Sequence, residues 1–112
     1  MDDLGDRMKA YENCFRYYLP RRSNLIIRVD GKTFSTLTKE LNGPFDQNFV
    51  KAMDSVAAHL LCSVQGAKLE YCQSDEVSLW VTDYDSLKTQ PWFGNSLQKI
   101  CSLTAGIATA AF

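Results

Sequence analysis

The 112-residue sequence has little of what builds metal-stabilised or cross-linked folds. It contains a single histidine, His59, and four cysteines, none of which form a Cys-x-x-Cys pair. Structural zinc sites need several such ligands at short spacing, and disulfide frameworks belong to oxidising compartments. A zinc domain and a disulfide-rich domain are therefore disfavoured, and the cysteines are expected to be reduced and mostly buried.

Long apolar runs and a strong net charge are also missing. No stretch is apolar enough to span a bilayer, and the acidic N-terminus lacks the apolar run of a signal peptide. We therefore expect a cytoplasmic protein with no membrane partner. The net charge is only -1, but eight of the 12 Lys and Arg residues fall within positions 1–40. Both a basic N-terminal face and ordinary solvated charges are consistent with this distribution.

The residues that are present suit one globular domain, because 46% are apolar and 12% are aromatic. We expect this domain to span residues 1–112. A chain of this size buries only about two thirds of its unfolded surface, so an enzyme with a large substrate normally needs more chain or partner subunits.

Hydrophobic patterning predicts an α+β fold. The β-branched run at 25–29 predicts a central strand covered on both faces, which ends at Asp30-Gly31. Two later runs make an antiparallel hairpin with Ser74, Asp75 and Glu76 at its tip. The predicted helices span 6–18, 32–40, 46 to about 62, and 95–112, and the hairpin strands span 67–73 and 77–82. From residue 24 this order resembles a ferredoxin-like unit, an antiparallel sheet with helices on one face, whose closing strand is absent or supplied elsewhere.

In such a unit the end of the first strand lies beside the hairpin tip, so Asp30 is expected to face Asp75 or Glu76. Carboxylates held this close repel each other unless they share a proton or bind cations, and oxygen-rich sites suit Mg²⁺. This arrangement is typical of two-metal phosphoryl transfer. Taken singly, Asp-Gly after a strand and Ser-Asp-Glu at a hairpin tip are also ordinary turns.

Residues around these carboxylates add candidate phosphate contacts. Gly31 lacks a Cβ, so its backbone can approach a phosphate or turn its carbonyl toward a metal. The amides of residues 32–35 open a predicted helix suited to a triphosphate, and Lys99 adds a positive charge near the start of the last helix. Arg28 is either a strand-face charge or a phosphate contact, and the sequence does not separate the two.

Two sequence blocks carry a family resemblance. The segments IRVDGKTFS at 27–35 and QSDEVSL at 73–79, with Thr38-Lys39-Glu40 and Pro44-Phe45-Asp46 between them, closely resemble the tRNA-His guanylyltransferase family. The chain is most similar to the bacterial, archaeal and phage branch of 3′-to-5′ polymerase-like relatives. The resemblance implies a polymerase palm that adds GMP or other nucleotides to the 5′ end of tRNA, either guanylylating tRNA-His or repairing truncated tRNA.

The resemblance also implies roles for individual residues. Asp30 and Asp75 would be catalytic, and with the Gly31 carbonyl they would bind two Mg²⁺ ions. Lys99 would contact the triphosphate. The implied nucleotide-binding residues are Asp30, Gly31, Lys32, Thr33, Phe34, Ser35, Ser74, Asp75 and Lys99. Implied partners are GTP, ATP, tRNA and further copies of the chain in a dimer or tetramer.

Two departures from the family pattern bear on function. Ser35 stands where eukaryotic members have a histidine, which favours general 5′-end repair over strict tRNA-His specificity. The resemblance also implies longer chains, whose C-terminal half supplies the remaining palm elements and much of the tRNA-binding surface, and we expect that half to be missing from this chain. Two alternatives stay open: another palm nucleotidyl transferase, such as a cyclase that makes a signalling nucleotide, and a non-catalytic nucleotide-binding or oligomerisation module.

Overall fold

The computed structural model describes residues 3–31 and 47–112. The predicted helix at 32–40 lies outside these residues, as do the candidate nucleotide contacts at 32–35. Every other predicted element is present, in the predicted order. In sequence these are α1 (Asp3–Asn13), β1 (Asn24–Asp30), α3 (Gln47–Ser63), β2 (Ala67–Gln73), β3 (Glu76–Thr82), the 3-10 helix η1 (Trp92–Asn95) and α4 (Leu97–Ala111).

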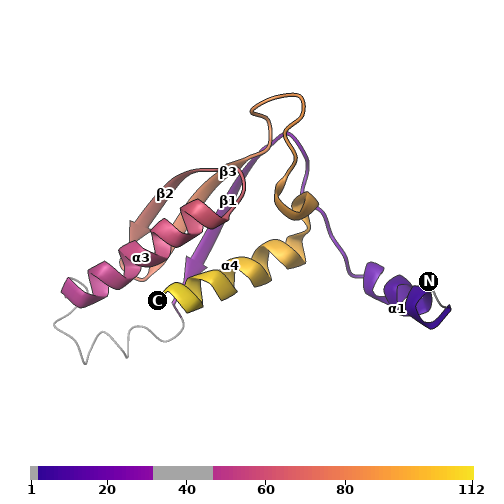
Figure 1. The fold of residues 1–112 in the computed structure, drawn as a ribbon, viewed down its shortest axis with the longest axis horizontal. Helices are drawn as coiled ribbons and strands as arrows, with labels where there is room; N and C mark the ends of the chain where they lie inside the picture. Colours follow the sequence, from indigo (N-terminus) through magenta and orange to yellow (C-terminus); the bar gives the residue numbers. More distant parts are fainter. Residues whose placement is uncertain (1–2, 32–46) are drawn as a thin grey trace.

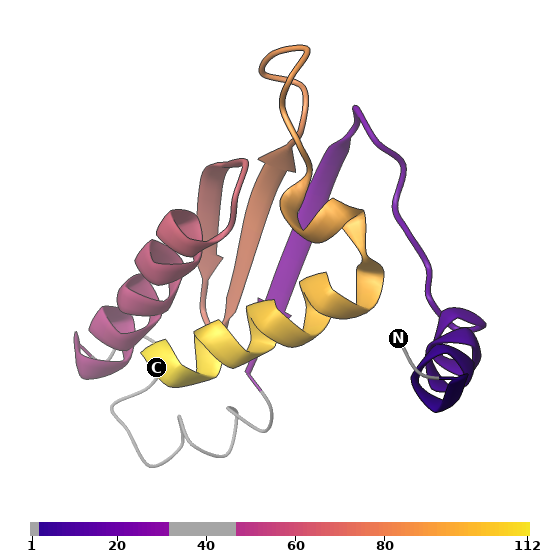
Figure 2. The same cartoon turned by 45° about the vertical axis from the view of Figure 1, so that its right-hand side comes forward.

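The three strands form one antiparallel sheet in the order β1-β3-β2. Helices α3 and α4 cover the same face of this sheet (Figure 1), and the turned view shows α4 crossing in front of β1 (Figure 2). The predicted α+β fold, with an antiparallel sheet and helices on one face, is confirmed. A fourth strand is not present in the ranges 3–31 and 47–112.

The hairpin is tighter than predicted. Gln73 pairs with Glu76 across β2 and β3, which leaves a two-residue turn of Ser74 and Asp75. Glu76 also pairs with Asp30 of β1, so it belongs to the central strand. Its placement at the hairpin tip was therefore wrong, because backbone pairing on both sides of β3 continues through this residue.

The core lies between the helix pair and the covered face of the sheet. Helix α3 contributes an apolar stripe of five buried residues at helical spacing: Phe49, Met53, Val56, Ala57 and Leu60. Every second residue of β3 meets this stripe, and Leu60 and Leu79 have no exposed surface. Burial of this continuous apolar layer is the main force that holds the sheet and helices together.

The prediction that β1 is a central strand covered on both faces was wrong for the described part of the chain. Burial alternates along β1, with Leu25, Ile27 and Val29 packed against the core while Ile26 and Arg28 are exposed. The central strand is β3, and β1 forms an edge of the sheet. We refer to the side of the sheet opposite α3 and α4 as the open face.

The open face carries a large aromatic side chain, that of Trp80. Trp80 is 39% exposed, and its indole N–H donates to Oδ1 of Asn24 at 2.9 Å. Tyr84 donates to the same oxygen at 2.6 Å. Trp92, by contrast, is buried at the start of η1. These bonds to Asn24 tie β1 to β3 and to the loop after β3.

The N-terminal helix ends earlier than predicted and stands apart from the sheet (Figure 1). It buries none of its residues. The segment that follows is extended and runs beside the start of α4, where the Leu97 N–H donates to Tyr17 O and the Leu19 N–H donates to Asn95 O, both at 2.9 Å. These two bonds fix the extended segment beside the start of α4.

The predicted helix at 95–112 is present as α4, which begins two residues later than predicted, at Leu97, and is separate from η1. Phe93, Gly94 and Asn95 all have positive φ angles, which no continuous α-helix allows. The side-chain amide of Asn95 holds this conformation, because it donates a hydrogen bond to Pro20 O at 3.0 Å. Among the helices that the structure describes, none combines the length and apolar content needed to cross a membrane.

Candidate active site

The end of β1 and the hairpin turn lie side by side, as predicted. Asp30 is the last residue of β1 and is opposite Glu76 in the ladder. The Gly31 N–H donates to Asp75 O at 3.0 Å, which extends the backbone pairing into the turn. The strand end and the turn are therefore fixed relative to each other by main-chain bonds. We call Asp30, Gly31 and Asp75 the acidic junction.

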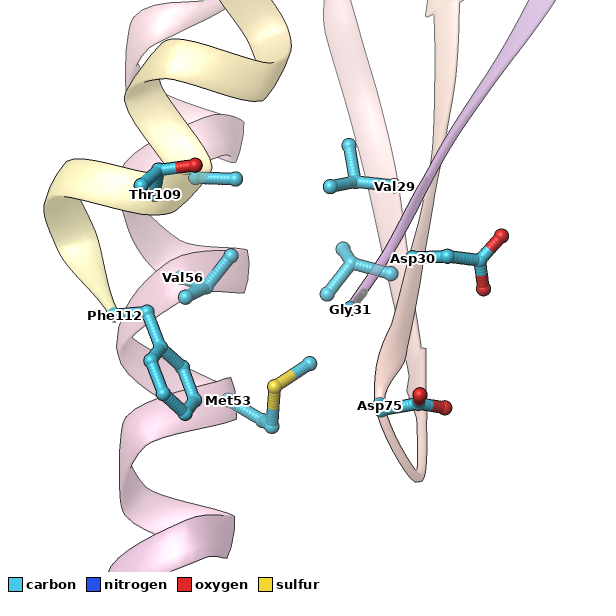
Figure 3. Close-up of a pocket in the computed structure, with 10 residues that line it drawn as sticks. Val29, Asp30, Gly31, Met53, Val56, Asp75, Thr109 and Phe112 are labelled. Atoms are coloured by element: carbon cyan, nitrogen blue, oxygen red, sulfur yellow. The ribbon is translucent and has the colours of Figure 1, made fainter. Parts of the chain in front are cut away.

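The two carboxylates of the acidic junction point to the same side. In Figure 3 the side chains of Asp30 and Asp75 extend away from α3 and α4, toward the open face. The Asp30 side chain is 52% exposed. Ser74, which precedes Asp75, has a φ of 54°, so the turn depends on a left-handed residue. The junction therefore presents carboxylate oxygens to solvent, where a cation or a polyphosphate has room to bind.

A cavity of about 300 Å³ lies behind the acidic junction, on the helix side of the strand ends. Its walls are apolar and include Met53, Val56 and Phe112, as Figure 3 shows. This volume is at the lower end of the range for small-molecule sites. The backbone of Asp30 and Gly31 thus separates a polar, solvent-exposed side from an apolar recess.

Arg28 is resolved as a charge on the open face. Its Nε lies 3.2 Å from Asp30 Oδ2, and its Nη2 lies 3.3 Å from Asp30 Oδ1. The same guanidinium forms an ion pair with Glu76. Sequence reasoning missed this contact, although residues two apart on a strand share a face and Glu76 follows the hairpin by one position. Arg28 and Glu76 therefore join the candidate site.

Two other predicted contacts lie elsewhere. Lys99 sits with Arg16 and Ser96 around a separate cavity of about 480 Å³, and its Nζ lies 5.3 Å from the Phe93 ring centroid. Its position, nine residues before Ala108 at the acidic-junction end, corresponds to about 14 Å along the helix axis. Ser74 lines a third cavity, on the β2 side of the turn. Within one chain, Lys99 and the acidic junction are at opposite ends of α4.

The donor chemistry of the acidic junction fits Mg²⁺. Among the residues that the structure describes, no three His, Cys, Asp or Glu side chains gather into a metal cluster. Two carboxylates and a carbonyl supply only oxygen ligands, and Mg²⁺ typically takes one or two carboxylates and completes its shell with water and phosphate. A site completed by substrate needs no third acidic side chain, so the residues present suit this ion.

Three of the basic residues in positions 1–40 form ion pairs in the described part of the chain: Arg16, Arg21 and Arg28. Arg16 pairs with Glu12 at 3.7 Å, and Arg21 pairs with the buried carboxylate of Asp83 at 3.9 Å. Asp83 also accepts the backbone N–H of Arg22 at 2.9 Å. These contacts anchor the start of β1 to the loop after β3. His59 is exposed, as expected.

The expectation of mostly buried cysteines was wrong. Cys14, Cys62 and Cys101 are exposed, and only Cys72 is half-buried; all four are free thiols. Cys72 points toward the core side of β2, where burial, with smaller contributions from the Asp54 and Glu70 carboxylates, raises the pKa of its thiol. The raised pKa lowers the thiolate fraction at a given pH, which makes Cys72 a poor nucleophile.

Cys72 should consequently be alkylated by iodoacetamide more slowly than the three exposed cysteines, because the thiolate is the reactive form. Peptide mass spectrometry after brief labelling at mildly alkaline pH measures the four rates in one sample. In urea the four rates should converge, which controls for local sequence effects. Labelling of Cys72 ahead of Cys101 in the folded chain would contradict the burial and charge around its thiol.

Comparisons with known proteins agree with this geometry. The family profile described as Thg1, tRNAHis guanylyltransferase, matches residues 5–112. A bacterial tRNA(His) guanylyltransferase (Thg1)-like protein in complex with GTP superposes with a TM-score of 0.94 at 50% identity over 98% of this chain. The same kind of protein in complex with ATP gives a TM-score of 0.93 at 50% identity over 97% of this chain. The uncharacterized protein R259 of Acanthamoeba polyphaga mimivirus is 31% identical over 78 residues, 70% of this chain.

The chain spans only part of these relatives: 52% and 48% of the two bacterial chains and 26% of the viral protein. The likeness nevertheless covers nearly every residue of the chain, including both strands and the turn of the acidic junction. The chain therefore belongs to the tRNA-His guanylyltransferase (Thg1) family.

Proposed function

We propose that this chain is the palm-like catalytic part of a Mg²⁺-dependent nucleotidyltransferase that adds GMP or other nucleotides to the 5′ end of tRNA. The observation that carries the proposal is the acidic junction. Two carboxylates and a glycine are fixed together by backbone pairing, in a chain that is 50% identical to proteins bound to GTP and ATP.

In this proposal Asp30, Asp75 and the Gly31 carbonyl hold two Mg²⁺ ions. Such ions activate an attacking hydroxyl and stabilise the charge of the leaving pyrophosphate. The chain's own contribution is positioning: the β1–β3 ladder and the bond from Gly31 N–H to Asp75 O fix the oxygen donors before substrate arrives. Donors fixed in advance avoid the cost of reorganisation during the reaction.

The remaining nucleotide contacts are proposed from the family pattern. Lys32, Thr33, Phe34, Ser35 and Ser74 would hold the nucleotide close to the acidic junction. Lys99 would bind a phosphate group at the other end of α4, where Arg16 lines the same cavity. Because α4 separates the two ends by about 14 Å, this phosphate would belong to a different part of the substrate complex from the reacting one.

Partners and location are part of the same proposal. GTP, ATP and tRNA would be bound in the cytoplasm, and the chain would act as a dimer or tetramer. The apolar side of α1 leaves a surface for such assembly, because none of that helix is buried in the described chain. The exposed apolar residues are Leu4, Met8 and Tyr11 of α1, and Phe15 just after it. Sedimentation velocity measures the assembly state directly.

Labelled-nucleotide addition tests the proposed reaction. The chain is incubated with 5′-truncated tRNA, ATP, Mg²⁺ and α-labelled GTP, and the RNA is separated by gel electrophoresis. We expect label in the tRNA, and none when EDTA removes the metal. A cyclic nucleotide formed without RNA would instead support a cyclase.

A non-catalytic nucleotide-binding module is the other alternative to a catalytic domain. It would be supported by Mg²⁺-dependent GTP binding in equilibrium dialysis with no label in any tRNA. The two measurements together therefore separate a catalytic domain from a nucleotide-binding module.

A further inference from the structure

Arg28 occupies the position at which a cation would approach Asp30. Its guanidinium contacts both carboxylate oxygens, with Nε 3.2 Å from Oδ2 and Nη2 3.3 Å from Oδ1. A cation bound by Asp30 would use the lone pairs of these same oxygens. Arg28 and a divalent cation therefore make competing demands on one carboxylate.

Glu76 provides Arg28 with a second partner on the same face. The Arg28 guanidinium forms an ion pair with Glu76 as well as with Asp30, and Glu76 lies directly opposite Asp30 in the ladder. If Arg28 left Asp30, it would keep one carboxylate contact on the neighbouring strand. The loss on release is therefore smaller than the loss of an isolated ion pair.

We propose that Arg28 acts as a built-in counter-ion that competes with divalent cations for Asp30, so that the acidic junction binds metal weakly in the absence of nucleotide. The inference rests on the proposed function for the nature of the cation. Arginine binds phosphate through paired N–H donors. An incoming polyphosphate would draw Arg28 from Asp30 and free the carboxylate for metal in the same event.

Stability alone does not account for the placement of Arg28. The side chains of Arg28 and Asp30 are 59% and 52% exposed, and ion pairs this exposed contribute little to folding. The same guanidinium would, in contrast, compete with a cation for the oxygens of Asp30 and repel the cation's charge, and both effects lower metal affinity. Removal of the Arg28 charge should therefore change the metal affinity without a matching change in the free energy of unfolding, and this difference distinguishes the proposed role from a structural one.

Electron paramagnetic resonance of Mn²⁺ tests the proposal on the full chain, because free and bound Mn²⁺ give separable signals. Titrations without nucleotide at low ionic strength compare the wild type with Arg28→Met. We expect Arg28→Met to bind Mn²⁺ about fivefold more tightly, the size of an exposed ion-pair interaction. The difference should shrink as salt is added, because exposed charges are screened. Arg28→Gln serves as a second neutral variant, with the same expected change.

Lys68→Met is the matched control. It removes one positive charge from the same sheet, but Lys68 pairs with Asp85 in the loop after β3. Its effect on Mn²⁺ affinity should be much smaller than that of Arg28→Met. Equal tightening in both variants would mean that net charge alone is responsible, and would overturn the specific role of Arg28.

Asp30→Asn separates failure of this inference from failure of the proposed function. If Asp30→Asn weakens Mn²⁺ binding but Arg28→Met does not tighten it, the metal site stands and the competition is refuted. If Asp30→Asn has no effect in either the wild type or the Arg28→Met background, the metal assignment itself is wrong. If adding Asp30→Asn to Arg28→Met abolishes the tighter Mn²⁺ binding, the result supports both the metal site and the competition.

Discussion

Replacing Asp30 with Asn is expected to lower the rate of 5′ nucleotide addition at least a hundredfold, a loss of about 2.7 kcal/mol of transition-state stabilisation. The change keeps the size of the side chain but removes the negative charge that would hold Mg²⁺ at the end of β1. Asp75→Asn should have a similar effect, because the backbone bond from Gly31 to Asp75 fixes both residues at one junction.

Single-turnover addition of labelled GMP to 5′-truncated tRNA measures this loss, and Mg²⁺-dependent GTP binding gives a second readout. Asp85→Asn is the control, since Asp85 is an exposed carboxylate in the loop after β3 that pairs with Lys68. It should react and bind as the wild type does, and circular dichroism should find all three variants folded. Wild-type rates in either Asp30→Asn or Asp75→Asn would refute the two-metal assignment.

The proximity behind this prediction could be inferred from sequence because it depends on local rules. A strand that stops at Asp-Gly and a short hairpin with carboxylates at its turn leave few ways to build an antiparallel sheet. In any antiparallel sheet that pairs the first strand with the second hairpin strand, Asp30 lies next to the turn. The stripe on α3 was equally predictable, since Phe49 to Leu60 follow helical spacing without interruption.

Which face of a strand is covered could not be predicted in the same way. The run at 25–29 contains three β-branched residues, so its composition fits burial on both faces, and only the positions of α3 and α4 decide that one face stays open. Trp80 shows the same limit: its residue type favours the core, yet its position on β3 puts it on the open face.

Long-range relations at the site depend on tertiary geometry as well. The sequence alone does not show how far Lys99 lies from the acidic junction. The direction of α4 places Lys99 near Arg16 instead. Arg28 could be placed on a face from strand alternation, but its choice of Asp30 and Glu76 as partners required the register of β1 against β3. Pairing between strands, more than local propensity, determines the electrostatics of this site.

The second large effect is expected for stability, at the connection between α3 and β2. Gly66 has a φ of 87°, and a Cβ added there would lie 2.3 Å from the carbonyl oxygen of Thr82. The Thr82 N–H donates to Gly66 O at 3.0 Å, so the two backbones cannot separate without breaking this bond. Gly66→Ala should therefore destabilise the fold by about 3 kcal/mol, combining left-handed strain with a backbone clash.

Thermal unfolding followed by circular dichroism would register this as a fall in Tm of more than about 10 °C. Gly106→Ala is the matched substitution, because Gly106 lies within α4 and no atom stands within 4 Å of its added Cβ. Alanine favours the helix over glycine by about 0.5–1 kcal/mol, so this variant should raise Tm. If replacing glycine by alanine lowers Tm at Gly66 but raises it at Gly106, then the backbone conformation and contacts at each position determine the change in stability. A Gly66→Ala protein as stable as the wild type would mean that the chain passes from α3 to β2 by another path.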